Sequence, residues 1–329
     1  MLDEAEIHLR PVRVETWAGC AFINFDVDAQ PLMNSLGPLT EELDARHVEK
    51  LRVDWWYASE LPVNWKVAVE AFMEMYHLMK THPQFHALSR TFGGELGDRN
   101  GLDPKLGLTA REAVNRSIDL MVNLSEGMGG LVHHSEVRIL ETLRDMELPD
   151  DPHEAIQCFF KRACDAIRDD GLARGLPMFD IAAVLSRYPG QGNELFFPNF
   201  FLLPQFSAMA SYRIRPTGPE SCLFEIWSLV LKPEKDTSPS PNAPTLLPYD
   251  SPDYPLIPRQ DYSNMPEQQK GLRSGAIIYQ RLSEVHEGAI SNFERLIDGY
   301  LAGLDINRLN RAHHVVNGCS FGPIADLGF

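Results

Sequence analysis

The chain of 329 residues has few cysteines, few basic residues and no long apolar run. Its five cysteines form no C-x-x-C pair and no close, even pattern, which argues against a disulfide framework and suits a reducing cytosol. Acidic residues outnumber basic ones by 46 to 30, and the net charge of -16 would repel nucleic acid or an anionic membrane. No run of about 18 apolar residues exists, so we expect no membrane-spanning helix. Because residues 1–30 lack signal-peptide features, we expect a cytoplasmic protein.

The composition, 44% hydrophobic and 23% charged, is that of a globular protein, and the element pattern indicates one large domain of the α+β class. Strand-like apolar runs, with Pro198 suggesting a bulge or edge in one of them, lie at 7–16, 20–26, 48–59, 193–203, 206–216 and 221–232. Helical periodicity lies at 38–47, 64–77, 134–148, 153–169, 260–274 and 285–304, with 111–125 open between helix and strand. Residues 86–109 predict a loop, and the eight prolines of 233–258 predict irregular chain lying against the surface.

Residues 64–83, NWKVAVEAFMEMYHLMKTHP, concentrate the side chains that could do chemistry. The helical pattern ends near His77, and Pro83 disfavours helical backbone at His82, so the chain must turn there. Two imidazoles across a helix end can converge on one metal ion, and Glu74 lies one turn before His77. Two histidines and one carboxylate are the ligands of non-haem iron(II) oxygenases. The spacing equally fits two surface histidines at the negative end of a helix.

The same stretch resembles the signature of the Rieske-type ring-hydroxylating oxygenases, whose catalytic domain carries NWK, then E-N-F, then (D/E)-x-Y-H-x4-H-P. The matching residues of this chain are Asn64, Trp65, Lys66, Glu70, Phe72, Glu74, Tyr76, His77, His82 and Pro83. Residues 17–32, the Phe197-Pro198-Asn199 triplet and residues 260–274 resemble further segments of the family, in the family's order. Ala71 stands where the family often has Asn, and Glu74 where many members have Asp.

The resemblance implies that His77, His82 and Asp261 hold a mononuclear iron(II). It also implies that Glu74 bridges to a histidine ligand of a Rieske [2Fe–2S] cluster on a neighbouring subunit and helps electrons to cross. The implied fold is helix-grip (START/Bet v 1-like), an antiparallel sheet wrapped around a long C-terminal helix. The implied function is hydroxylation of an aromatic or other apolar substrate with O2, in a homotrimer supplied with electrons by a ferredoxin or reductase.

The chain departs from the family pattern in lacking both the C-x-H and the C-x2-H pair that hold the Rieske cluster. We therefore expect residues 1–40 to be the remnant of a Rieske domain with its connector, and residues 41–329 to be the catalytic iron domain. By itself, such a chain would lack the electrons it needs. The alternatives are a helix-grip ligand-binding protein without redox activity and a zinc hydrolase that uses the same three ligands.

Other side chains compete with this assignment. Asp253, in the proline-rich stretch, could replace Asp261 as the carboxylate ligand. The histidine pairs 133–134 and 313–314 are adjacent in sequence, and neighbouring side chains rarely point at one metal. Residues on the predicted strands that could line a pocket, although such residues more often fill a core, are Phe196, Phe197, Phe200, Phe201 and Met209.

Overall fold

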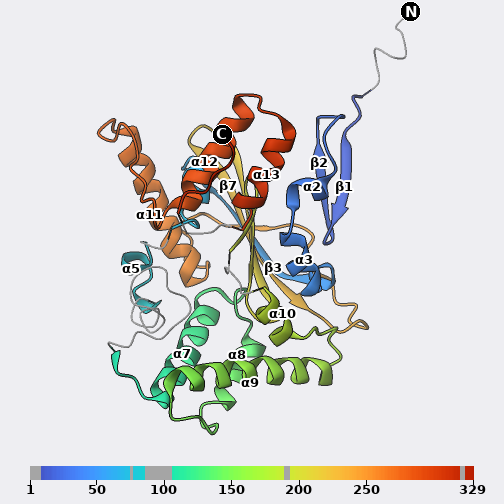
Figure 1. Cartoon of the computed structure of the whole chain (residues 1–329), viewed down its shortest axis with the longest axis vertical. Coiled ribbons are helices and arrows are strands. Elements are labelled where there is room, and N and C mark those ends of the chain that lie inside the picture. Colours follow the sequence, from blue (N-terminus) through green and yellow to red (C-terminus); the bar gives the residue numbers. More distant parts are fainter. Residues whose placement is uncertain (1–8, 75–76, 86–105, 189–192, 319–322) are drawn as a thin grey trace, which may run out of the picture.

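The computed structural model describes residues 9–74, 77–85, 106–188, 193–318 and 323–329, and its centre is a six-stranded sheet (Figure 1). The strands follow the order β4-β5-β6-β7-β3-β8. Their bounds are β3 (Leu51–Leu61), β4 (Glu194–Phe196), β5 (Phe200–Pro204), β6 (Met209–Gly218), β7 (Ser221–Leu231) and β8 (Thr245–Leu246). All neighbouring pairs are antiparallel except β3 and β8, which pair in parallel over two residues. The predicted antiparallel sheet is confirmed.

The predicted strand over residues 193–203 is instead a tight hairpin, β4 and β5, so that prediction was wrong. Residues 197–199 form the turn between the two strands. Pro198 has no N–H to donate to a strand ladder, and it occupies the middle of this turn. Asn199 holds the turn against β6, because its side-chain amide donates to the Ile214 carbonyl at 2.7 Å and its own carbonyl accepts from the Ile214 N–H at 3.0 Å.

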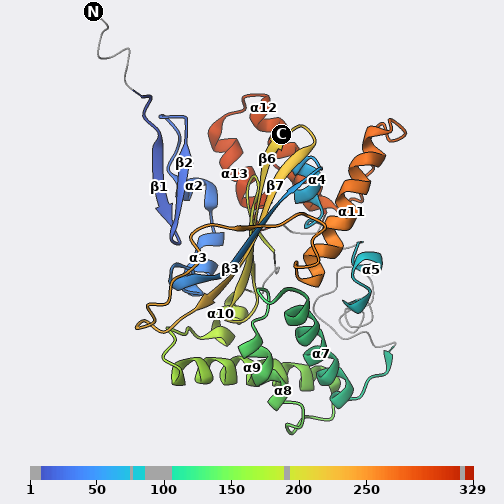
Figure 2. The same ribbon diagram turned by 180° about the vertical axis from the view of Figure 1, so that it is seen from behind.

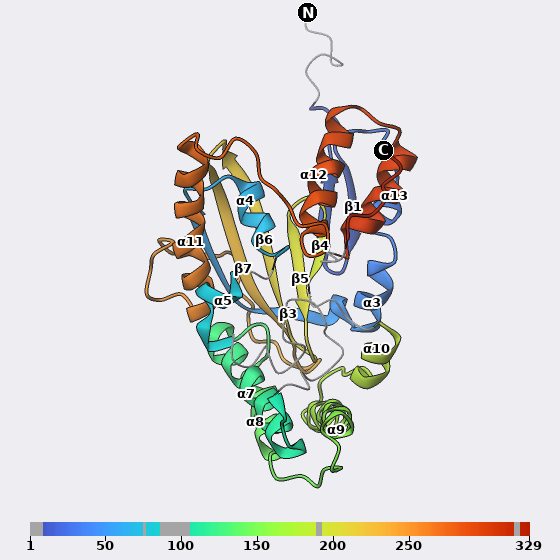
Figure 3. The same ribbon diagram turned by 60° about the vertical axis from the view of Figure 1, so that its left-hand side comes forward.

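Three helices cover one face of the sheet: α4 (Trp65–Glu70), α11 (Leu256–Arg273) and α12 (Gly288–Leu301) (Figure 3). Alternate residues of β7, among them Phe224 and Ile226, project to this face because successive strand residues point to opposite sides. They pack in one buried cluster with Tyr262 of α11 and Phe293 of α12. The sheet thus holds the helices of the C-terminal part, which confirms the α+β class and its helix-grip arrangement. Beyond the predicted helix at 285–304 lies α13 (Ile306–Val316), which sequence periodicity did not predict.

A second group of helices lies at the other end of the sheet from α12 and α13 (Figures 1 and 2). It comprises α7 (Ala110–Met128), α8 (His134–Thr142), α9 (Pro152–Ala173) and α10 (Ile181–Arg187). The segment left open between helix and strand is therefore a helix, and it starts with a reciprocal capping box between Thr109 and Glu112. These helices enclose their own apolar cluster around Ile118, Phe159 and Ile167.

The N-terminal part packs on the opposite face of the sheet. The predicted hairpin is confirmed as β1 (Arg13–Trp17) and β2 (Cys20–Asn24), and it is followed by α2 (Leu32–Leu36), α3 (Leu39–Ala45) and the short helix η1 (Val48–Lys50). Trp17 connects the hairpin to β4 and α3. Its ring lies 5.3 Å from that of Phe196, and its Nε1–H donates to Asp44 at 3.0 Å. The described helices include none with both the length and the apolar character needed to cross a bilayer.

Of the two predicted loops, one is described only in part and the other in full. Residues 86–105, most of the predicted Gly-rich loop, lie outside the described residues. The proline-rich stretch is irregular, as predicted, apart from β8 and the start of α11 at Leu256. Its β8 segment adds an edge strand to the sheet, and the Leu247 N–H extends this contact by donating to the Ala58 carbonyl at 3.0 Å.

Candidate metal centre

The helix predicted over residues 64–77 is wrong beyond Glu70: of its described residues, only Trp65–Glu70 form a helix, α4, and a second short helix begins after residue 77. The first, α4, begins after Asn64, whose side chain accepts a hydrogen bond from the Lys66 N–H at 2.9 Å, and it ends at Glu70. The Met73 N–H then donates to the Glu70 carbonyl three residues back, the tighter geometry typical of a helix end. The Met73 side chain is fully buried in the core, so packing against the sheet stabilises the bend.

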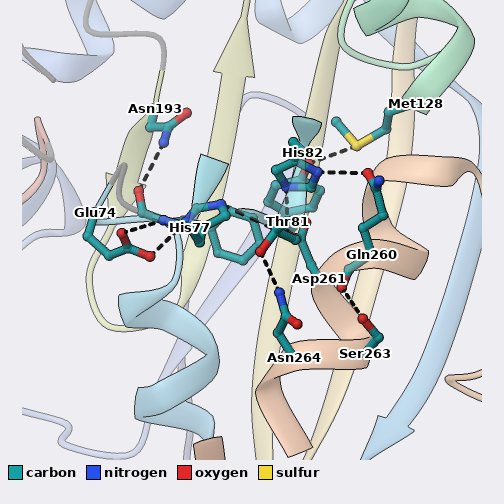
Figure 4. A network of polar contacts seen from close by, with 12 residues as sticks. Glu74, His77, Thr81, His82, Met128, Asn193, Gln260, Asp261, Ser263 and Asn264 are labelled. Carbon is teal, nitrogen blue, oxygen red and sulfur yellow. Dashed lines mark hydrogen bonds and ion pairs between the residues drawn. The ribbon is translucent and has the colours of Figure 1, made fainter. Parts of the chain in front are cut away.

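The second helix, α5 (Leu78–Thr81), has one histidine at each end. His77 is its N-cap and His82 its C-cap. The backbone of His82, at φ -122° and ψ 63°, is outside the helical region, as the proline after it predicts. Tyr76, the motif residue before His77, lies outside the described residues. The two imidazoles therefore flank one short turn of helix and reach the same side of it (Figure 4).

The two histidines meet Asp261 of α11, which is 179 positions from His82 in the sequence. The Nε2 atom of His82 lies 2.9 Å from Asp261 Oδ1, and the Nε2 atom of His77 lies 3.9 Å from the same oxygen. One ligand atom from each residue falls within 4.8 Å of the other two. Among the described residues this is the only group of three or more such side chains that could hold a metal ion. Asp253, the competing carboxylate, is not part of it.

The donor set suits a divalent transition metal: two imidazole nitrogens and one carboxylate oxygen. Two ligands at about 2.1 Å from a metal and at right angles to each other are about 3.0 Å apart. The 2.9 Å between His82 Nε2 and Asp261 Oδ1 already meets that separation. The 3.9 Å of His77 Nε2 is about 1 Å longer, so this side chain must shift inward to complete a three-ligand face.

The His77 ring is oriented by a carboxylate from its own segment. Glu74 Oε1 lies 2.6 Å from His77 Nδ1, and Glu74 Oε2 accepts a hydrogen bond from the His77 N–H at 3.2 Å. Burial lowers the pKa of His77, but the hydrogen bond to Glu74 and the charges of Glu74 and Asp261 outweigh it, so the pKa is raised. A ligand histidine commonly donates its second N–H to such a carboxylate, which directs Nε2 toward the metal.

The His82 ring is oriented by a neutral amide, Gln260, which lies on α11. Its Nδ1 lies 2.8 Å from Gln260 Oε1, and its side chain is almost completely buried, with only 2% of its surface exposed. Phe85 packs beside the ring at a centroid distance of 5.7 Å. Gln84 contacts the same Gln260 oxygen at 2.8 Å. Sequence reasoning missed both glutamines; the only signal was an amide residue immediately before Asp261 and another shortly after His82.

A sequence comparison with protein families matches this chain to a known group. The profile "Ring hydroxylating alpha subunit (catalytic domain)" matches residues 47–127 and 185–303, together more than half of the chain. The chain belongs to this family. The matched ranges contain all three residues of the cluster, and the family resemblance of residues 64–83 is confirmed.

Relatives of this ring-hydroxylating domain include the carnitine monooxygenase oxygenase subunit of Acinetobacter baumannii, 34% identical over 85 residues, which are 25% of this chain and 23% of that protein. The 2-aminobenzenesulfonate 2,3-dioxygenase subunit alpha of Alcaligenes sp is 37% identical over 76 residues, 23% of this chain and 19% of that protein. Each match thus covers less than a quarter of the relative's length.

Two solved structures match this chain with similar TM-scores, identities and coverage. The quaternary ammonium Rieske monooxygenase CntA with an inhibitor bound has a TM-score of 0.49 at 15% identity, covering 91% of this chain and 64% of that chain. A naphthalene 1,2-dioxygenase variant bound to phenanthrene has a TM-score of 0.47 at 18% identity, covering 93% of this chain and 68% of that chain.

In this ring-hydroxylating domain, a layer of aromatic side chains adjoins the cluster. The Phe72 ring lies 4.8 Å from that of Tyr212 and 5.6 Å from that of Phe201. The Tyr212 hydroxyl donates to Met128 Sδ at 2.9 Å. Burial raises the pKa of Tyr212 well above its ordinary value, and the charge of Asp261 adds to the shift, so the phenol keeps its proton. The side chains beside the cluster are therefore aromatic and uncharged.

Of the five residues considered as pocket lining, only Phe201 belongs to the same buried cluster as Met73. Phe197, in the β4–β5 turn, packs against that cluster beside Phe293 of α12 and His313 of α13. Phe196, Phe200 and Met209 lie on the opposite face of the sheet. The alternation of strand residues between faces explains the division.

The adjacent histidine pairs have structural partners. His133 caps α8, accepting from the Ser135 N–H at 3.3 Å, while His134 Nδ1 lies 3.1 Å from Ser125 Oγ. His313 is buried against the Tyr300 hydroxyl at 2.5 Å, and burial lowers its pKa to about 4. Neither pair joins a metal-binding group among the described side chains.

Proposed function

We propose that this chain provides the mononuclear iron(II) site of an oxygenase component, with His77, His82 and Asp261 as the ligands. The observation that carries this proposal is the approach of both Nε2 atoms to a single oxygen of Asp261. Such a two-histidine, one-carboxylate set leaves coordination positions open on one side of the metal, which is the arrangement used by non-haem iron(II) oxygenases. Membership of the ring-hydroxylating family supports the same chemistry.

When bound, iron(II) would supply the one-electron chemistry that activates dioxygen for hydroxylation. The protein's part is to hold the ligand atoms and to limit water. Glu74 keeps the proton on His77 Nδ1, so that Nε2 faces the cluster. His82 and Asp261 are buried, with 2% and 10% of their side chains exposed, so their side of the site is screened from bulk solvent.

The substrate class that we propose is a small aromatic or other apolar molecule, because Phe72, Phe201 and Tyr212 form an uncharged aromatic cluster beside the proposed ligands. A quaternary ammonium compound is the second candidate. Aromatic faces also attract cations, and a relative of this chain is a carnitine monooxygenase. Monooxygenation and dihydroxylation are both compatible with this arrangement.

We further propose that the electrons come from a Rieske [2Fe–2S] cluster whose ligands lie outside residues 1–329, reduced by a ferredoxin or reductase. The 329 residues contain neither the C-x-H nor the C-x2-H pair. Glu74 would be the point of entry, which fits a homotrimer in which the cluster of one subunit serves its neighbour. Residues 1–40 would belong to the cluster domain and its connector, and residues 41–329 to the catalytic domain. The free thiols of the four described cysteines suit the reducing cytoplasm.

Metal analysis of protein purified without added metal tests the site. We expect iron close to one per chain, and we expect His82→Ala to abolish iron retention. His153→Ala is the matched control, because this exposed histidine at the start of α9 lies outside the cluster and its loss should leave the iron in place. Zinc instead of iron would favour the hydrolase, and absence of any metal the ligand-binding protein. Full iron occupancy in His82→Ala would contradict the ligand assignment.

A further inference from the structure

Gln260, which contacts His82 (Figure 4), also forms a reciprocal amide pair with Gln84. Gln84 Nε2 donates to Gln260 Oε1 at 2.8 Å, and Gln260 Nε2 donates to Gln84 Oε1 at 3.3 Å. The same Gln260 oxygen lies 2.8 Å from His82 Nδ1. One carbonyl oxygen therefore serves two donors, which its two lone pairs permit.

This contact decides which nitrogen of His82 is available to a metal. In a neutral imidazole one nitrogen carries the proton and the other offers a lone pair. An oxygen placed at Nδ1 favours a proton there. When a metal replaces the direct 2.9 Å hydrogen-bond contact between Nε2 and Asp261, the lone pair on Nε2 is then the one available to it. If the Gln260 amide were reversed, its NH2 group would face Nδ1, the proton would move to Nε2, and metal binding at Nε2 would be blocked.

The two ligand histidines differ in what their partners require. Glu74 beside His77 is a carboxylate, which has only acceptor oxygens and needs no further residue to orient it. Gln260 beside His82 has one acceptor end and one donor end, so a second group must determine which end faces the imidazole. Gln84 meets that need, because it donates to the Gln260 oxygen and accepts from the Gln260 NH2.

We propose, on the basis of the iron site proposed above, that Gln84 and Gln260 are positioning residues that hold His82 in the metal-binding tautomer. A neutral amide also suits the charge of the centre. A divalent metal with Asp261 and Glu74 nearby is already neutral, and a third carboxylate at position 260 would leave excess negative charge in a largely buried site.

The test is the affinity of the metal-free protein for cobalt(II), measured by competition with a chelator. Gln260→Ala should lower the affinity about 10- to 100-fold, the usual effect of losing a partner of a ligand histidine. Gln84→Ala should lower it less, because the Gln260 oxygen remains but its orientation is no longer enforced. Gln268→Ala, the same change at an exposed position of α11, is the control and should leave the affinity unchanged.

The variant Gln260→Glu separates orientation from packing. A carboxylate accepts at either oxygen, so it should keep the His82 contact without help from Gln84. We therefore expect Gln84→Ala to weaken binding in the wild-type background and to have little effect in the Gln260→Glu background. A merely structural role of Gln84 would weaken binding equally in both backgrounds, and that result would overturn the positioning role.

A spectroscopic readout follows the proton itself. In zinc-loaded protein labelled with ¹⁵N-histidine, long-range proton–nitrogen correlations should show the proton of His82 on Nδ1. In Gln260→Ala that proton should exchange faster with solvent. Wild-type protein that binds metal through Nδ1 of His82 would overturn the positioning role and leave the iron site intact. Wild-type protein that binds neither cobalt nor zinc would overturn the iron site as well.

Discussion

His77 and His82 flank the same short helix, yet their surroundings are unlike. His77 has 24% of its side chain exposed and takes its orienting partner, Glu74, from three residues earlier in the chain. His82 has 2% exposed and takes its partners from α11, at positions 260 and 261. One histidine is thus supported by local contacts and the other by contacts that exist only in the folded protein.

The distances to Asp261 show the same division. His82 Nε2 is already at 2.9 Å from Asp261 Oδ1, the separation expected for two ligands of one metal, whereas His77 Nε2 is at 3.9 Å. The positions of two of the three proposed ligands, His82 and Asp261, are therefore set by the fold itself. The position of the third, His77, depends on the segment that contains Glu74. Three measurements test this contrast.

The largest expected difference is in folding stability. In the metal-free protein, His82→Ala should lower the free energy of unfolding by about 1–3 kcal/mol, because it leaves Asp261 buried without its partner. His77→Ala should cost less than about 1 kcal/mol, since Glu74 stays near the surface and still accepts from the backbone N–H. Urea unfolding of both variants measures the difference. Equal losses, or a larger loss for His77→Ala, would contradict the division into local and long-range support.

The second expected effect concerns metal affinity and the local partner. Glu74→Ala should weaken cobalt(II) binding about 10- to 100-fold, because His77 loses the carboxylate that directs its Nε2. The free energy of unfolding of the Glu74→Ala variant should change little, since the contact between Glu74 and His77 joins residues only three positions apart. Chelator competition gives the affinity, and urea unfolding of the same samples gives the stability. Strong destabilisation without loss of affinity would mean that Glu74 supports the fold and not the ligand.

The third expected effect is a pH dependence of the free energy of unfolding, caused by Glu70, the last residue of α4. Burial, followed by the hydrogen bond and charge of Glu294, raises the pKa of Glu70 to about 8, while Lys66 opposes and Glu287 adds to the shift. An acid whose pKa is raised on folding adds stability that is fully present below its unfolded pKa, near 4.5, and is lost as the pH rises through about 8.

Glu70→Gln should remove this dependence, because the amide donates to Glu294 at any pH. The melting temperature of the variant should therefore rise relative to the wild type between pH 5 and pH 9, as scanning calorimetry across that range would record. Glu267→Gln on the exposed face of α11 is the control and should show no such trend. A difference that is constant over the pH range would contradict a raised pKa at Glu70.

Local patterns in the sequence predicted much of this fold. The alternation of β7 and the apolar stripe of residues 285–304 predicted a strand and a helix that the structure contains. The continuous helix over residues 64–77 was wrong, because burial of Met73 in the core outweighs the local preference to continue the helix. The single strand over residues 193–203 was wrong because a proline in its middle favours a turn once β6 is present to hold it.

By itself, the sequence determined that His77 and His82 would lie close together, because five residues across a helix end leave little freedom to separate, and it indicated the family through the motif around them. Asp261 became a candidate through that resemblance, but only the tertiary structure brought its carboxylate to the two imidazoles. The structure alone also placed the Gln260 oxygen at Nδ1 of His82 and the Asp261 oxygen at Nε2. The proton position depends on a hydrogen-bond partner from α11, and no local pattern around His82 specifies a contact across 178 positions.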